Sequence, residues 1–203
     1  MIKSLYTLAA VSLFTLPIAA NASIIYSTTG LSGTFTTENF DINGGEGTAA
    51  ASQFTGVVFG AGNYVSNFYN GSFPNMVNYQ VGNFVESGIQ PITDPTSFNF
   101  TSDIFELAFA FVSNPQTTTV SAFLNNILVE SVALSTDYSG NYVSISGYTF
   151  DEVRITSIGS NNAYILDDMQ YKVAQVPEPA ALALVGIGLA GLGFSSRKAR
   201  AKA

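Results

Sequence analysis

The chain has 203 residues, no histidine, cysteine or tryptophan, and a formal net charge of −7. A Ser-His-Asp triad, a cysteine nucleophile, a cysteine-ligated zinc site and an iron–sulfur cluster are therefore excluded. Four of the seven basic residues lie in the last seven positions, so the charge is spread very unevenly along the chain.

The first 22 residues have the three parts of a secretory signal peptide. Lys3 supplies the positive charge, residues 5–20 form the apolar core, and Ala20-Asn21-Ala22 matches the small-residue cleavage pattern. We therefore expect cleavage after Ala22, with the mature protein beginning at Ser23. The alternative is an uncleaved transmembrane helix, which the short apolar core and the cleavage pattern disfavour.

Residues 23–175 are predicted to form one domain, which is long enough to bury a substantial core. This domain holds thirteen acidic residues but only two basic ones, Arg154 and Lys172. Such a surplus repels nucleic acid and anionic lipid, whereas neutral glycans and cations are compatible with it. The simpler interpretation is that the acidic residues keep an exported domain soluble.

The composition of this domain is typical of strands and turns, because it is rich in Phe, Tyr, Val, Thr, Ser, Asn and Gly. Alternation of apolar residues is clearest in residues 104–111. There Glu106, Ala108 and Ala110 point to one side. The opposite face is predicted to be core and consists of Phe105, Leu107, Phe109 and Phe111.

About ten to twelve short strands are expected, at a spacing of roughly 8–12 residues and without intervening helices. This pattern predicts an all-β fold, an antiparallel β-sandwich of jelly-roll type, flanked by the signal peptide and a C-terminal transmembrane helix. The predicted strands are 24–26, 34–36, 54–59, 64–68, 76–81, 97–100, 104–111, 118–124, 127–134, 142–145, 152–158 and 163–173.

Residues 176–203 combine a short motif, an apolar span and a basic tail. The motif is Val176-Pro177-Glu178-Pro179, whose prolines separate the domain from the apolar span because proline lacks a backbone N–H. The uncharged residues 180–194 would extend roughly 22 Å as a helix, against a hydrocarbon core of about 30 Å. The positive-inside rule predicts a cytoplasmic tail. Its basic residues are Arg197, Lys198, Arg200 and Lys202.

This segment resembles the PEP-CTERM sorting signal of exported bacterial envelope proteins, with Pro177-Glu178-Pro179 as the named motif. The resemblance implies recognition by an exosortase-type membrane protease, cleavage near the motif, and export linked to extracellular polysaccharide. A GPI signal is a competing interpretation, but such signals end in the hydrophobic tail and not in a basic cluster. The other alternative is a plain membrane anchor that is never processed.

Two adjacent carboxylates, Asp167 and Asp168, interrupt the apolar last strand. The strand is similar to the last strand of jelly-roll carbohydrate-binding modules, in which an Asp can bind structural calcium together with groups from the first strands. Glu38 and Asp41, with Glu46 nearby, lie early in the domain. Calcium takes six to eight oxygen ligands. The resemblance therefore implies a calcium site formed by Asp167, Asp168, Glu38 and Asp41. The alternative is an exposed bend whose carboxylates accept backbone hydrogen bonds.

One stretch of the first half interleaves aromatic rings with amides. This mixture predicts a glycan site, because a pyranose has an apolar face and a polar rim. The candidate residues are Tyr64, Asn67, Tyr69, Asn70 and Phe73. The alternative is that these rings are core residues of two strands. The absence of tryptophan, the strongest stacking side chain, weakens the glycan interpretation and so favours this alternative.

The sequence therefore predicts a non-catalytic protein of the cell surface or extracellular matrix, first anchored in the inner membrane and associated with exopolysaccharide. A lectin-like, calcium-stabilised module is the alternative function. A carboxylate pair can hydrolyse glycosides, but nothing in the sequence marks any two acidic residues as a pair. Enzyme activity is not expected, and no cofactor other than structural calcium is predicted.

Overall fold

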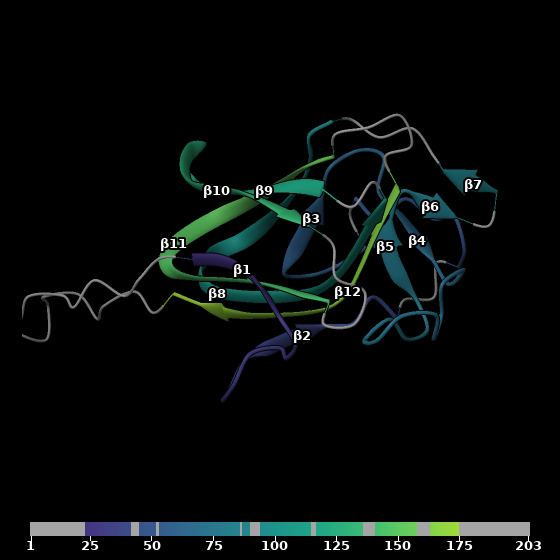
Figure 1. Ribbon diagram of the computed structural model, residues 1–203, viewed down its shortest axis with the longest axis horizontal. Coiled ribbons are helices and arrows are strands. Elements are labelled where there is room, and N and C mark those ends of the chain that lie inside the picture. Colours follow the sequence, from purple (N-terminus) through teal and green to yellow (C-terminus); the bar gives the residue numbers. More distant parts are fainter. Residues whose placement is uncertain are drawn as a thin grey trace, which may run out of the picture.

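The computed structural model describes residues 23–41, 45–51, 53–85, 87–89, 94–114, 117–135, 141–157 and 163–174. These residues form an all-β antiparallel domain (Figure 1), which confirms the predicted fold class at this level. Within the described ranges, no helix has the length and apolarity needed to cross a membrane. The predicted signal peptide and the sorting segment with its transmembrane helix lie outside the described residues.

Ten of the strands form one sheet, in the order β10-β9-β11-β8-β12-β5-β4, with β1 on β11, β2 on β12 and β3 on β8. A separate two-stranded hairpin consists of β6 and β7. Every strand pair is antiparallel. The strands are β1 (Ser23–Ser27), β2 (Thr36–Glu38), β3 (Val57–Phe59), β4 (Tyr64–Ser66), β5 (Gln80–Gly82), β6 (Phe84–Val85), β7 (Gly88–Ile89), β8 (Thr96–Asn114), β9 (Thr117–Leu124), β10 (Ile127–Ser135), β11 (Tyr142–Ser157) and β12 (Ala163–Val173).

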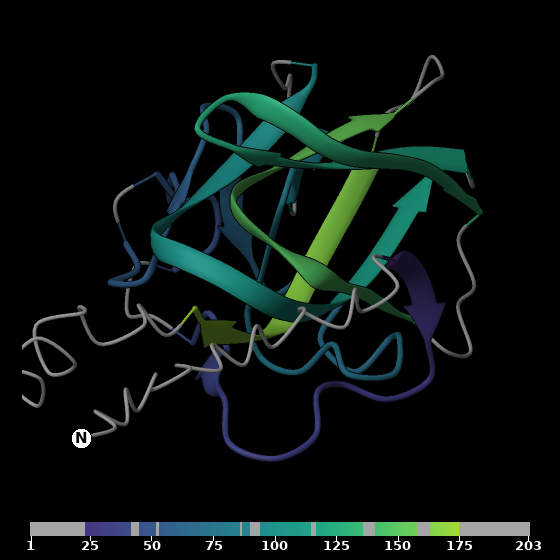
Figure 2. The ribbon, with the colours of Figure 1, turned by 90° about the vertical axis from the view of Figure 1, so that its left-hand side faces the viewer.

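Two long strands, β8 and β11, carry the sheet around the core. The first part of β8 pairs with β3 and with the second part of β11, whereas its remainder pairs with β12 and the first part of β11. The sheet therefore folds over on itself, as the curving strands in Figure 2 show. The rings of Phe98 and Phe109, one from each part of β8, meet with centroids 5.5 Å apart, so both parts face the same core.

These long strands correct the predicted element boundaries. Predicted strands 97–100 and 104–111 are one strand, and so are 142–145 and 152–158. Residues 101–103 and 146–151, which the prediction left outside strands, continue β8 and β11, and register shifts in the β8–β11 ladder accommodate the irregularity there. Of the predicted strand 76–81, only the last two residues are in a strand.

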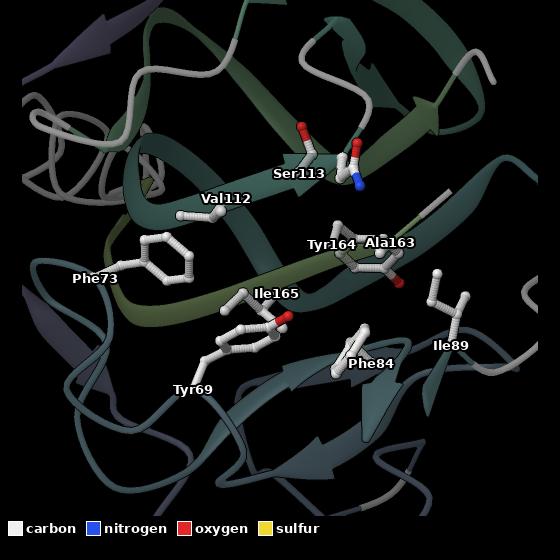
Figure 3. Close-up of a pocket in the computed structure, with 10 residues that line it drawn as sticks. Tyr69, Phe73, Phe84, Ile89, Val112, Ser113, Ala163, Tyr164 and Ile165 are labelled. Carbon is white, nitrogen blue, oxygen red and sulfur yellow. The ribbon is translucent and has the colours of Figure 1, made fainter. Parts of the chain in front are cut away.

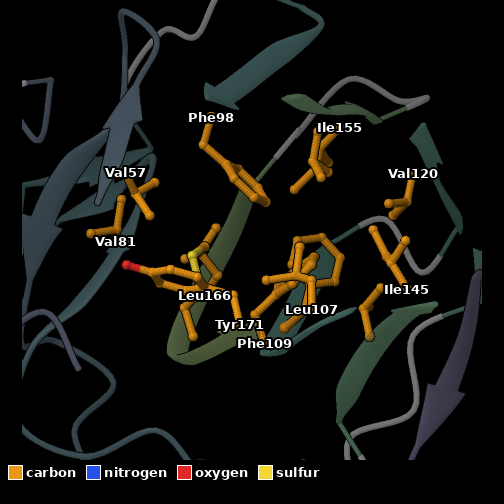
Figure 4. Packing of buried hydrophobic residues seen from close by; sticks show 14 of the residues in the cluster. Val57, Val81, Phe98, Leu107, Phe109, Val120, Ile145, Ile155, Leu166 and Tyr171 are labelled. Atoms are coloured by element: carbon orange, nitrogen blue, oxygen red, sulfur yellow. The ribbon is translucent and has the colours of Figure 1, made fainter. Parts of the chain in front are cut away.

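The main core lies inside the folded sheet and is built from aromatic and branched side chains of nearly every strand (Figure 4). Leu107, Phe109 and Phe111 are fully buried in it, as predicted. Phe105 is only half-buried, and Ile104 takes its place in the core. The reason is a bulge: on the β12 side, Lys172 pairs with Glu106 and Val173 pairs with Ile104, so Phe105 has no opposite residue.

The outer face of β8 and β12 is also covered. Ala108 and Ala110 do point away from the main core, as predicted, yet both are fully buried in a second apolar cluster. Residues 67–79, which form turns and irregular structure, contribute to the cover over this face. The second cluster consists of Met76, Ala108, Ala110, Val112, Tyr142 and Ile165, with Leu31, Tyr69, Phe73 and Phe84 packed against it.

Candidate functional site

The segment of residues 67–79, hereafter the covering segment, is held in shape by its own turns. Asn70 N–H donates to Asn67 O at 3.0 Å, and Ser72 N–H donates to Tyr69 O at 2.9 Å. Asn75 and Asn78 both have a φ of 59°, a left-handed conformation in which asparagine is enriched. Local sequence thus shapes the segment, and longer-range contacts attach it to the sheet.

Asp167 makes one of these attachments from β12. Its side chain is only 2 % exposed, and its two oxygens accept hydrogen bonds from Val77 N–H at 2.8 Å and Asp168 N–H at 2.7 Å. Burial raises the pKa of Asp167 to about 8, and the neighbouring charges of Asp168 and Asp41 act in the same direction. The Asp167 carboxylate accepts backbone hydrogen bonds, as expected for the alternative of a bend in the strand. The residue is buried, however, and not exposed as that alternative predicted.

Asp168 forms a second polar contact on the same strand. Its Oδ2 accepts hydrogen bonds from the Tyr142 hydroxyl on β11 and from Gln170 Nε2, the latter at 3.0 Å. Burial is the main cause of a raised Tyr142 pKa, and the hydrogen bond to Asp168 adds to it. Asp168 has a φ of 42° and lies where the β12–β8 register shifts. The bulge explains how two consecutive carboxylates fit in an apolar strand.

The early acidic residues occupy different places. Asp41 binds the covering segment, because it accepts hydrogen bonds from Asn78 Nδ2 at 3.0 Å and Tyr79 N–H at 3.2 Å. Glu38 lies on β2 opposite Met169, and burial raises its pKa. Glu46 accepts hydrogen bonds at the start of the segment, from Ser66 Oγ at 2.9 Å and Asn67 N–H at 2.6 Å.

These contacts involve most of the residues of the predicted calcium site. Asp41 and Asp167 both bind residues 77–79, so the fold does bring the early and late acidic residues to one region. Their oxygens, however, accept hydrogen bonds from protein donors. Among the residues that the structure describes, no group of three or more acidic side chains is arranged to hold a metal ion. Calcium binding stays a prediction from the sequence.

A pocket of about 440 Å³ opens beside the covering segment (Figure 3). It lies between the end of β8, the start of β12, the β6–β7 hairpin and the aromatic side chains of the segment. Most of the lining side chains are apolar, polar atoms contribute a substantial part of the surface, and none of the described residues that line the pocket is charged. The lining residues are Tyr69, Phe73, Phe84, Ile89, Val112, Ser113, Asn114, Ala163, Tyr164 and Ile165.

Of the predicted glycan-binding residues, Tyr69 and Phe73 line this pocket, but Tyr64, Asn67 and Asn70 do not. Tyr64 lies on β4 opposite Gly82. The Asn70 side chain accepts a hydrogen bond from Asn78 N–H at 2.9 Å, and so supports the covering segment.

The other pocket residues were missed by the sequence analysis. Phe84 and Ile89 come from the β6–β7 hairpin, whereas Val112 and Ile165 come from β8 and β12, which lie further along the chain. Phe84, Ile89 and Val112 lie outside the predicted strands, and Ile165 follows the ordinary pattern of a strand residue, so no local signal marks the four as a group.

Comparison with known proteins assigns the C-terminal end of the chain. Residues 175–198 match the PEP-CTERM protein-sorting motif, which confirms the resemblance seen in the sequence. The chain thus combines a described all-β domain with a C-terminal PEP-CTERM motif. The motif implies export, processing by an exosortase and sorting to the cell surface. No curated protein matches the chain.

Several solved structures are similar in fold. A cleaved adhesin domain of Lys-gingipain has 14 % identity and a TM-score of 0.44, over 69 % of this chain and 100 % of that one. Another, from Porphyromonas gingivalis, has 13 % identity and a TM-score of 0.37, over 77 % of this chain and 100 % of that one. The Agl-KA catalytic domain has 12 % identity and a TM-score of 0.41, over 78 % of this chain and 31 % of that one. Likeness at this level carries no information on function.

Proposed function

We propose that the chain is a non-catalytic protein of the cell surface or extracellular matrix, associated with exopolysaccharide. In this proposal, residues 23–175 are the exported domain and residues 176–203 are the sorting signal. The observation that carries it is the position of the motif. Its match begins at residue 175, directly after β12 ends at Val173. A folded acidic domain is therefore attached to its sorting signal almost without a spacer.

The surroundings of the carboxylates support a non-catalytic role. A glycosidase needs two carboxyl groups facing each other across the scissile bond. Asp41, Asp167 and Asp168 instead accept hydrogen bonds from the protein, and the part of the pocket lining that the structure describes contains no acidic residue. The chain has no histidine to act as a general base near neutral pH.

The sorting part of the proposal is tested by expressing the full chain with and without an exosortase and measuring intact masses. With the protease, the product should lack Arg197, Lys198, Arg200 and Lys202; a Pro177→Ala/Pro179→Ala variant should keep them. In both strains we expect the product to begin at Ser23. A product that retains the basic tail in the exosortase strain would contradict processing.

Association with exopolysaccharide is tested by cosedimentation of the exported protein with polysaccharide from the same cells. The competing candidate, a lectin-like module, rests on Tyr69 and Phe73 at the pocket. A glycan array separates the two, because a lectin binds a narrow set of glycans and a general matrix protein does not. Calcium stabilisation is tested by thermal unfolding with and without EDTA, and an unchanged midpoint excludes it.

The proposal extends to the type of fold within the all-β class. We infer a β-sandwich of jelly-roll type, because β8 and β11 each contribute to both parts of the folded sheet around one core. An experimental structure of the exported protein would test this assignment through the strand order.

A further inference from the structure

We propose that the pocket beside the covering segment binds a neutral, mainly apolar small molecule with a hydrogen-bonding group at one end. A medium-chain alcohol or ester is the kind of ligand we mean. The inference is independent of the sorting proposal, because it rests only on the shape and chemistry of the pocket. At about 440 Å³, the pocket is within the roughly 300–1,000 Å³ usual for small-molecule sites.

The aromatic wall of the pocket is preformed. The Tyr69 ring lies 5.5 Å from Phe73 and 5.0 Å from Phe84, measured between centroids, and Phe68 lies 5.1 Å from Phe84. These contacts fix the rings against one another, as seen in Figure 3 for the labelled three. The backbone beneath is fixed too, because Gly71 N–H donates to Met76 O at 2.8 Å. A site that is already ordered costs little conformational entropy when a ligand binds.

The opposite wall is rigid because it belongs to the sheet. Val112 near the end of β8 and Ile165 near the start of β12 are directly paired, and both are buried. Their side chains lie on the face that also carries Ala108 and Ala110. The space is therefore bounded by two walls that are each supported from behind, which prevents its collapse.

The chemistry of the lining selects the ligand class. The described residues of the lining offer no charged side chain to pair with an ion, so a charged ligand would lose hydration without compensation from them. The domain is strongly acidic overall, which further disfavours anions. A sugar would bury many hydroxyl groups against apolar side chains. Asn114 at the end of β8 is exposed and lines the pocket, and it suits a ligand with one polar end, whereas the buried Ser113 hydroxyl already accepts a hydrogen bond from Thr118 Oγ1 at 2.9 Å.

The rim of the pocket exposes apolar surface that a ligand would cover. Ile89 on β7, which lines the pocket, is 43 % exposed. Removing such surface from water stabilises the bound state by roughly 25 cal/mol per Å². Ile89 is therefore a suitable position for a test: a charge there would face the entering ligand without disturbing the core.

The test is photolabelling of the full chain in detergent micelles with 3-trifluoromethyl-3-phenyldiazirine, a neutral aromatic probe, followed by peptide mapping. We expect label on the peptides that contain Tyr69, Phe84 and Ile165, and competition by 1-octanol but not by cellotetraose. Ile89→Asp should lower labelling of these peptides about tenfold. The matched control is Ile127→Asp, at an apolar residue that is 71 % exposed on β10, which should leave it unchanged.

A second variant covers the case in which Ile89→Asp does not fold. Ala163→Leu adds volume at the start of β12 without adding charge, and it should also lower labelling. Folding of each variant is checked by its thermal unfolding midpoint. The proposal is overturned if the label spreads equally over all exposed apolar residues, if Ile127→Asp acts like Ile89→Asp, or if cellotetraose competes and octanol does not.

Discussion

The carboxylate of Asp167 accepts a 2.8 Å hydrogen bond from the backbone N–H of Val77, which lies 90 residues earlier in the chain. This contact joins the middle of β12 to the covering segment. The same segment carries Tyr69 and Phe73, which both line the pocket. A buried acid in the sheet therefore helps to position aromatic rings at the surface, and its substitution should affect stability and the pocket together.

The protonation of Asp167 should make stability depend on pH. Burial raises its folded-state pKa from 3.8 to about 8, so the folded protein holds a proton that the unfolded chain releases. The associated stability is fully present below the unfolded pKa and is lost as the pH rises towards the folded value. We expect denaturant-derived free energies of unfolding to fall by up to about 1.4 kcal/mol per pH unit across this window.

Asp167→Asn should flatten this slope, because the side chain no longer titrates. Asn has only one oxygen for two backbone N–H donors, so the variant should also lose stability at low pH, where the native acid is protonated. Asp103→Asn is the control, since Asp103 is exposed on β8. An equal slope in the native protein and in Asp167→Asn would show that this acid is not the titrating group.

The contact between Tyr142 and Asp168 should contribute measurably to stability. Tyr142 is only 4 % exposed and its hydroxyl donates to the Asp168 carboxylate, a charge-assisted hydrogen bond. We expect Tyr142→Phe to lower the free energy of unfolding by about 1.5–3 kcal/mol. A double-mutant cycle with Asp168→Asn, which suits the left-handed backbone at this position, measures the coupling. Additive effects of the two substitutions would contradict a direct interaction.

The bulge at Phe105 predicts unequal effects of two similar substitutions on β8. Phe109→Ala removes a fully buried ring and should lower the free energy of unfolding by about 3–5 kcal/mol. Phe105→Ala removes a half-buried ring and should cost clearly less. Urea denaturation of both variants measures the difference. Equal losses would mean that Phe105 is a core residue, as unbroken alternation predicts.

Close backbone approach makes Gly82 on β5 sensitive to any side chain. A Cβ at this position would lie 2.1 Å from Tyr164 O and 2.9 Å from Ile165 Cα, so β5 and β12 would have to separate. We expect Gly82→Ala to destabilise by about 1–3 kcal/mol or more. Gly60→Ala is the comparison, because its nearest neighbour, Ser97 Oγ, would be 3.1 Å away. Thermal unfolding should place Gly82→Ala clearly below Gly60→Ala.

The features that could be predicted from the sequence are local in nature. The C-terminal motif with its apolar span and basic tail, the all-β class and strands such as β9, β10 and β12 all come from patterns of neighbouring residues. Alternation also identified most of the core face of β8, because side chains of a strand point to opposite sides in turn.

Only the tertiary structure decided the rest, since it depends on contacts between distant segments. The burial of Ala108 and Ala110 on the outer face of β8 requires the covering segment. The sequence predicted Asp167 either as a calcium ligand or at an exposed bend, whereas its burial depends on the contact with Val77, 90 residues away. Likewise, no local pattern links Phe84, Val112 and Ile165, and they line one pocket only because the fold brings three remote strands together. Burial and proximity are properties of the folded chain, and alternation along a strand cannot encode them.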